Sequence, residues 1–484
     1  MLKSLLPGVL LAATLSVSAQ DKIQQVENSL KPWVQVENAP AVGLNIYERM
    51  KAYNVPSVSI AVIDNGKIAW TKAYGLADVA DKKPATPQTL YQAASISKSI
   101  NAAGIMKLVE AGKLSLDKDI RSYLKTWTFP DNKFSKGQPI TLRHLMNHTA
   151  GLSVHGFGGY EAGKPLPTIN QILDGTPPSQ SAKVEPVFKP GERMQYSGGG
   201  TTVIRKIIED NINTDYAGLY QKLVFTPLKM THSTFIQPLP ASLAPNAATA
   251  YDSDGKPLKG RYHTYPELSP DGLWTTPSDL ATYAIAMQQS LDSAKGSFLK
   301  PATVRQMLAP FSEKQQVGYG FFITEAGDQK FFGHGGSNDG FKCALYAGET
   351  NHQGVAVMIN SDNGAIIDEI VNAVAEVYGW KRFYQPAIKK VITPSADSIA
   401  AYTGKYNIKA VGIGLEIISR NGVPGLTRSD RSTWEQLYFT DESRFFILSE
   451  RFDLRFVRDR SGKVTGIEIR TGDQGFVADK VAAE

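Results

Sequence analysis

The sequence predicts an α+β domain followed by a small, separate all-β domain. Strand-rich segments lie at both ends of the first domain, at 55–78 and 317–363, with helices and loops between them. That order is typical of an α+β domain whose first and last strands share one sheet. From Pro394 to Val481 the chain changes to short alternating runs separated by turns. Such runs favour a small antiparallel barrel or sandwich.

The first two elements follow from local signals. The segment at 55–78 contains Asp-Asn-Gly at 64–66 between two β-rich runs. Asn and Gly tolerate positive φ, so this tripeptide predicts a hairpin. Ser95–Gly112 is expected to be a helix, because its apolar residues recur at helical spacing and Gly112 suits the position after a helix end.

The later elements set the expected domain boundaries. From Leu114 to about Lys300 the chain alternates helices with Pro- and Gly-rich loops, and a helix at Ile366–Tyr378 follows the second strand-rich segment. The composition changes after Pro386. We therefore expect a mixed domain at 20–386, a linker at 387–396 and a lipocalin-like barrel domain at 397–484.

The composition excludes an intrachain disulfide and argues against a nucleic-acid partner. The chain has 484 residues, a formal charge of +6 and one cysteine, Cys343, so no intrachain disulfide is possible. The basic residues are scattered, with no run longer than two. Nucleic acid is therefore not an expected partner.

The first twenty residues, MLKSLLPGVLLAATLSVSAQ, resemble a secretory signal peptide. One lysine precedes a short apolar run, and Val17-Ser18-Ala19 fits an A-x-A-like cleavage site. The run is shorter than the roughly 20 apolar residues that span a bilayer. No cysteine directly follows it, which excludes a lipoprotein anchor. We expect a signal peptide at 1–19, cleavage after Ala19, and a periplasmic or secreted protein without a membrane span.

Ser95 and Lys98 lie three residues apart at the start of the expected helix. At this spacing both side chains lie on one face, so Lys98 can reach Ser95. A serine hydroxyl is a weak nucleophile until a base takes its proton. A lysine serves as that base only when its surroundings lower its pKa from about 10.4. A helix cap followed by a solvated lysine explains the same pattern, so other residues must decide.

Two further stretches contain suitable side chains. Tyr196 precedes a glycine run and an apolar-periodic helix in QYSGGGTTVIRKII, which predicts a ring held on a tight turn. The stretch FGHGGSNDG combines His334 with Gly335, Gly336 and Ser337. Residues without side chains let a substrate lie along a strand edge. Taken alone, the first stretch fits a core tyrosine equally well, and the second fits a loop.

Signatures of other enzyme classes are absent from the sequence. No serine has glycines two residues before and after it, and there is no Walker A motif, HExxH or strict GxGxxG. His144 and His148 form HxxxH with no acidic residue between them. A packing role is therefore favoured there over a zinc site.

The ordered set of SxxK, Tyr-Ser-Gly and His-Gly-Gly resembles the serine β-lactamase-related family. This family includes class C β-lactamases, DD-peptidases, D-aminopeptidases and esterases, with motifs SxxK, Tyr-x-Asn and [Lys/His]-x-Gly. ITLRHLMNHTAGL at 140–152, VFTPLKMTHSTF at 224–235 and DGLWTTPSDLATY at 271–283 are also similar, so the resemblance covers roughly residues 35–385. The Ser-Asp-Asn at 361–363 spells a class A motif but follows the third motif, so we expect a strand-ending turn there.

The resemblance implies a β-lactamase/DD-peptidase fold and hydrolysis of an ester or amide through an acyl-enzyme on Ser95. Lys98 and Tyr196 would form the proton-transfer pair, with the lysine's charge lowering the pKa of the phenol. The backbone N–H groups of Ser95 and Ser337 would form the oxyanion hole. The residues expected on the substrate and oxyanion side are His334, Gly335, Gly336 and Ser337.

Two departures from the family pattern weaken β-lactam recognition. Gly198 stands where the family has Asn in Tyr-x-Asn, which removes an amide. His334 stands where β-lactamases have Lys, and histidine is mostly neutral at pH 7 with a reference pKa of about 6.5. The pattern resembles the aminopeptidase and esterase branch, so weak or no β-lactamase activity is expected.

The alternative function is a catalytically inactive, penicillin-recognising sensor or binding protein. Intact Ser95, Lys98 and Tyr196 argue against it. The resemblance implies a peptide or small-molecule substrate and no metal or nucleotide cofactor. The sequence leaves the exact substrate and the oligomeric state open.

Overall fold

The computed structural model describes residues 20–39, 44–292, 298–409, 413–429, 431–450, 452–471 and 474–481. The expected signal peptide at 1–19 lies outside them. The chain divides into two compact units. One unit consists of Val55–Tyr251 and Pro257–Gly364, and the other takes in Met1–Asn54, Asp252–Lys256 and Ala365–Glu484.

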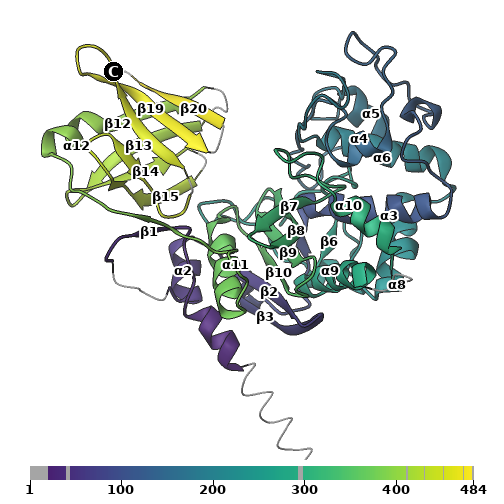
Figure 1. The fold of residues 1–484 in the computed structure, drawn as a ribbon, viewed down its shortest axis with the longest axis horizontal. Coiled ribbons are helices and arrows are strands. Elements are labelled where there is room, and N and C mark those ends of the chain that lie inside the picture. The colour runs from purple at the N-terminus through teal and green to yellow at the C-terminus, as the bar shows by residue number, and fades with distance from the viewer. Residues whose placement is uncertain are drawn as a thin grey trace, which may run out of the picture. The chain divides into compact units, whose positions relative to one another are not determined.

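The first unit is built on a seven-stranded sheet in the order β4-β3-β2-β10-β9-β8-β7 (Figure 1). Its strands are β2 (Ser57–Asp64), β3 (Lys67–Asp78), β4 (Lys83–Pro84), β7 (Phe322–Ala326), β8 (Gln329–Asn338), β9 (Phe341–Gly348) and β10 (Gly354–Ile359). Antiparallel pairing of β2 with β10 joins the early strands to the late ones. The expectation that both ends of the domain share one sheet is confirmed.

The predicted hairpin is the β2–β3 connection. Asn65 and Gly66 adopt φ angles of 51° and 69°, the left-handed pair that a tight two-residue turn requires. The register then places apolar residues of both strands in the core, as with Val62 opposite Trp70.

Helices and short turns make up the rest of the first unit. They are η1 (Ala94–Ile96), α3 (Ser97–Glu110), η2 (Ile120–Ser122), α4 (Leu142–Met146), α5 (Ile169–Asp174), α6 (Gly198–Asn211), α7 (Tyr216–Tyr220), the π-helical η3 (Gln221–Phe225), α8 (Thr226–Leu228), η4 (Ala244–Asn246), α9 (Pro277–Asp292) and α10 (Pro301–Leu308). A two-stranded ladder pairs β5 (Tyr91–Gln92) with β6 (Trp274–Thr275).

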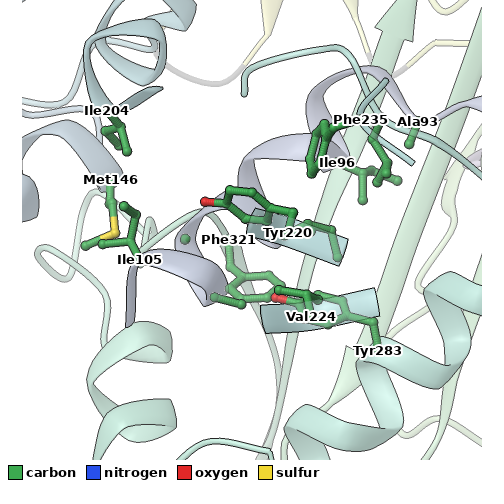
Figure 2. Close-up of a cluster of buried hydrophobic side chains, with 14 of the residues drawn as sticks. Ala93, Ile96, Ile105, Met146, Ile204, Tyr220, Val224, Phe235, Tyr283 and Phe321 are labelled. Carbon is green, nitrogen blue, oxygen red and sulfur yellow. The ribbon is translucent and has the colours of Figure 1, made fainter. Parts of the chain in front are cut away.

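Helix α3 is central to the core. Almost every residue from Ser97 to Leu108 is buried, whichever side of the helix it faces. Such a helix is enclosed by protein rather than lying on a surface. Figure 2 shows part of its packing, where Ile105 lies near Met146 and the rings of Tyr220, Tyr283 and Phe321 gather in the same cluster.

The second unit contains helices and a barrel. Helix α2 (Ile46–Ala52) and helix α11 (Ala365–Val377) are joined by an ion pair between Arg49 and Glu369 at 2.6 Å. Strand β1 (Val34–Val36) pairs in parallel with β11 (Ala387–Lys389). The segment expected to be a linker at 387–396 therefore begins with a strand.

Helix α12 (Ala396–Tyr402) leads into a nine-stranded antiparallel sheet that forms a near-closed barrel, as the sequence predicts. In sheet order its strands are β15 (Arg431–Gln436), β14 (Val423–Arg428), β13 (Ile413–Arg420), β12 (Gly404–Ile408), β20 (Gln474–Lys480), β19 (Val464–Thr471), β18 (Asp453–Arg458), β17 (Arg444–Phe446) and β16 (Tyr438–Phe439). Its core combines aliphatic and aromatic side chains, with Tyr402 stacked on Phe456 at 3.8 Å between ring centroids.

None of the helices in the described ranges is long and apolar enough to cross a membrane.

Candidate active site

Ser95 lies in the 3₁₀ turn η1, immediately before α3. The sequence placed it inside the helix, but the helix begins at Ser97. The preceding Ala94 adopts a φ of 46°, a left-handed conformation that is strained for a residue with a Cβ. The turn is held by its neighbours, since the Ala93 N–H donates to Leu273 O at 2.8 Å. Ser95 itself is half-buried.

Lys98 lies one turn after Ser95 and contacts it directly. Its Nζ is 3.0 Å from Ser95 Oγ, 2.9 Å from Pro270 O and 3.3 Å from Asp271 Oδ1. The side chain is only 3% exposed. Burial lowers the pKa of Lys98, but Asp271 and Tyr196 outweigh burial and raise it above its usual value. Lys98 is therefore a protonated, buried cation in the resting site.

Asp271 is a site residue that the sequence reasoning missed. Its Oδ1 accepts a hydrogen bond from Ser95 Oγ at 3.1 Å and pairs with Lys98. Its side chain is 5% exposed. The only signal was its place at the start of DGLWTTPSDLATY, a segment that supported the family resemblance without assigning a role.

Tyr196 completes the predicted group. Lys98 Nζ lies 4.9 Å from the centroid of its ring, and a side-chain hydrogen bond with Tyr196 also raises the pKa of Lys98. The tyrosine is placed by Ser197, whose hydroxyl accepts from Gly200 N at 2.9 Å and so caps helix α6.

Two histidines that the sequence did not assign to the site pack against Tyr196. The centroids of the His148 and His155 rings lie 4.4 and 4.9 Å from that of Tyr196. His148 Nδ1 accepts from Ser197 N at 3.3 Å. Burial lowers the pKa of both histidines, and the charge of Lys98 adds to this. No group of three or more His, Cys, Asp or Glu side chains that could hold a metal ion occurs among the described residues.

His334 lies on strand β8 beside this group. Its ring centroid is 6.0 Å from that of Tyr196, and its Nδ1 donates to Gly335 O at 2.5 Å. Burial, followed by the nearby Lys98 charge, lowers the pKa of His334 to about 3. The imidazole is neutral at physiological pH, as the sequence analysis expected.

The glycines after His334 keep strand β8 close to Ser95 and leave its edge bare. Strand β7 pairs with β8 only as far as Gly333, so the following residues have one partner strand, β9, within the described sheet. A Cβ on Gly336 would lie 2.3 Å from Ala93 O, two residues before the nucleophile. This close approach requires glycine and places Ser337 beside the η1 turn.

Gly198 is enclosed rather than facing open space. Its N–H donates to His155 O at 2.9 Å, and a Cβ there would lie 3.0 Å from the Phe157 ring and 3.1 Å from the same carbonyl. The loop that supplies His155 thus fills the volume into which an Asn side chain would extend.

The Ser-Asp-Asn at 361–363 follows the end of β10. Its aspartate, Asp362, pairs with Lys342 at 2.6 Å. The strand-ending turn expected for this motif is confirmed.

Comparison with known proteins agrees with this geometry. The sequence profile of the beta-lactamase family matches residues 44–375, which is more than half of the chain. The chain belongs to the beta-lactamase family. It is thereby a member of a family of serine hydrolases.

Among curated proteins, the chain is 24% identical to Protein flp of Staphylococcus aureus, over 74% of this chain and 68% of that protein. It is 25% identical to the teichoic acid D-alanine hydrolase of the same species, over 63% and 69% respectively.

Among solved structures, the octameric penicillin-binding protein homologue from Pyrococcus abyssi matches with a TM-score of 0.61 and 23% identity, covering 89% of this chain and 98% of that one. The D-amino acid amidase of Ochrobactrum anthropi matches with a TM-score of 0.56 and 21% identity, covering 74% and 99%. At these identities the structures establish the fold alone.

Proposed function

We propose that this protein is an exported serine hydrolase that cleaves an ester or amide of a D-amino acid through an acyl-enzyme on Ser95. The observation that carries the proposal is the 3.0 Å contact between Lys98 Nζ and Ser95 Oγ. A buried cation that donates to the serine oxygen stabilises negative charge developing there. Tyr196, bound to the same lysine, is positioned to exchange protons with the leaving group.

The charges around Ser95 support a neutral or cationic acyl group over an anionic one. A β-lactam carries a carboxylate, and His334, with a pKa of about 3, offers it no cation. Lys98 is already paired with Asp271. A second carboxylate brought near Asp271 meets repulsion at low dielectric. The ammonium group of an amino-acid substrate is instead attracted to Asp271, which offsets its repulsion by Lys98.

The names of similar proteins support the choice of acyl group. One curated relative is a teichoic acid D-alanine hydrolase, and two structures of the same fold are a D-amino acid amidase and a D-alanine carboxypeptidase. The bonds cleaved by these proteins differ, but each name contains a D-amino acid. We propose the same class of acyl donor for Ser95.

A matched substrate panel tests the proposal. D-alanyl and L-alanyl p-nitrophenyl esters, the corresponding p-nitroanilides and nitrocefin are compared at one pH, with Ser95→Ala as the blank. We expect D-alanyl turnover that Ser95→Ala lacks, and slow or absent nitrocefin hydrolysis. Nitrocefin turnover comparable with the best ester would contradict the specificity. No turnover and no covalent labelling of Ser95 would instead favour an inactive binding protein.

A further inference from the structure

Asp271 has no role in the mechanism above, although its carboxylate touches the nucleophile. Oδ1 lies 3.1 Å from Ser95 Oγ and 3.3 Å from Lys98 Nζ, so one oxygen faces both groups. Because Lys98 is protonated, its Nζ donates to Ser95 Oγ. The serine hydroxyl hydrogen is then free to point at Asp271, which is the hydrogen bond that the structure contains.

We propose that Asp271 is a catalytic residue that accepts the Ser95 proton, so that the site works as a Ser–Lys–Asp group with a protonated lysine. The inference rests on the proposed acyl-enzyme function. It replaces the expectation that a neutral Lys98 removes the proton, because an ammonium group has no lone pair with which to do so.

The proton balance closes over contacts in the structure. The Ser95 O–H bond breaks, its proton passes to Asp271 Oδ1, and the electron pair on Oγ forms the bond to the acyl carbon, while the carbonyl pair moves to oxygen. When that pair re-forms the carbonyl, the bond to the leaving group breaks. The leaving group keeps the bonding pair and takes a proton from the Tyr196 hydroxyl. Tyr196 is reprotonated by Lys98, and Lys98 by Asp271.

The groups facing Asp271 keep its carboxylate as the local base. Glu267, in the same loop, has a pKa raised to about 8 by burial and is protonated at pH 7. Burial raises the pKa of Tyr265 and lowers that of His155, so both are neutral. Of these groups and Lys98, the lysine alone is cationic. Asn338 contacts the backbone, donating to Asp271 O at 3.1 Å.

Asp271 is also held in place for this role. Its segment is fixed from both sides, since Pro270 O accepts from Lys98 and the Leu273 N–H donates to Ser97 Oγ at 3.1 Å. Its second oxygen, Oδ2, is buried without a hydrogen-bond partner among the described residues. Burial places the carboxylate in a medium of low dielectric constant, which strengthens its interaction with the Ser95 hydroxyl.

The test is the rate at which a fluorophosphonate modifies Ser95, measured against pH. Fluoride leaves without needing a proton from Tyr196, so the rate reports the nucleophile and its base. We expect Asp271→Asn to slow labelling at pH 7 by about 10²-fold or more, which is the usual worth of a general base. The wild-type labelling rate should fall at acidic pH as the carboxylate is protonated. The pH profile of Asp271→Asn should lack this acid limb.

Two variants guard against a purely structural explanation. Asp271→Glu keeps a carboxylate and should keep the acid limb, even where the rate is lower. Asp279→Asn removes another buried carboxylate, which accepts from His232 N and Ser233 Oγ, and should label like the wild type. If Lys98 is the base, the Asp271→Asn substitution lowers the pKa of Lys98, and the variant is labelled as fast as the wild type or faster. That result overturns the inference, whereas failure of the wild type to label overturns the proposed function itself.

Discussion

Glu267 gives the structure a measurable dependence of stability on pH. It lies in the loop that carries Asp271, is 1% exposed and leaves Oε2 without a hydrogen-bond partner among the described residues. Burial raises its pKa from 4.5 to about 8. A raised folded-state pKa means that the folded protein holds this proton more tightly than the unfolded chain. The resulting stabilisation is complete below the unfolded pKa and is lost progressively as the pH rises towards 8.

The size of the effect follows from that difference. Each pKa unit is worth about 1.4 kcal/mol, so the full loss is on the order of 5 kcal/mol, of which about 4 kcal/mol falls between pH 5 and pH 9. Glu267→Gln keeps the shape of the neutral side chain and cannot ionise. Between pH 5 and pH 9, the free energy of unfolding should therefore fall by about 4 kcal/mol less in the variant than in the wild type.

The assay is urea unfolding followed by tryptophan fluorescence at pH 5 and at pH 9. The difference between the two pH values is compared for the wild type, for Glu267→Gln and for Glu192→Gln, which alters an exposed glutamate of the same unit. The Glu192 variant should follow the wild type. Equal pH dependence in the wild type and Glu267→Gln would refute the assignment of a buried, neutral carboxyl to this loop.

The remaining predictions concern activity and export. Hydrolysis should be nearly abolished by each of the single substitutions Ser95→Ala, Lys98→Ala and Tyr196→Phe. The double mutants should lose little more activity, because the effects of residues that act as a unit are non-additive. Steady-state kinetics of the single and double mutants measure this, and additive losses of activity would contradict a shared step. Gly336→Ala should lower kcat on the order of 10²-fold, because a Cβ 2.3 Å from Ala93 O displaces strand β8 from the nucleophile. An unchanged kcat would contradict the close approach of Gly336 to Ala93. The mature protein should begin at Gln20 in a periplasmic or extracellular fraction, as N-terminal sequencing can test, and an intact Met1 in the cytoplasm would be evidence against export.

What the sequence predicted best depended on local chemistry. The β2–β3 hairpin follows from two residues that tolerate positive φ, and the contact of Lys98 with Ser95 follows from their spacing. The sequence did not predict that Ala94 adopts a left-handed φ, or that Ser95 lies in a 3₁₀ turn before the helix.

The missed residues were those that only folding brings to the site. Asp271 is 176 positions from Ser95 in the chain, and an aspartate before Gly-Leu-Trp resembles any polar turn residue. His155 belongs to a loop whose path is set by its carbonyl accepting from Gly198 N. The sequence shows that Gly198 lacks the amide of the family's Asn. The structure shows in addition that the loop containing His155 fills the space that an Asn side chain would occupy.

The most direct test of the central claim is to trap the acyl group on the protein. An activated D-alanyl ester is mixed with the enzyme, the reaction is stopped in acid within milliseconds to seconds, and the digested protein is examined by mass spectrometry. The account predicts a D-alanyl mass increase on the peptide that contains Ser95, lost in Ser95→Ala and removed in the wild type on longer incubation. A modification on a different residue, or hydrolysis by Ser95→Ala at the wild-type rate, would contradict it.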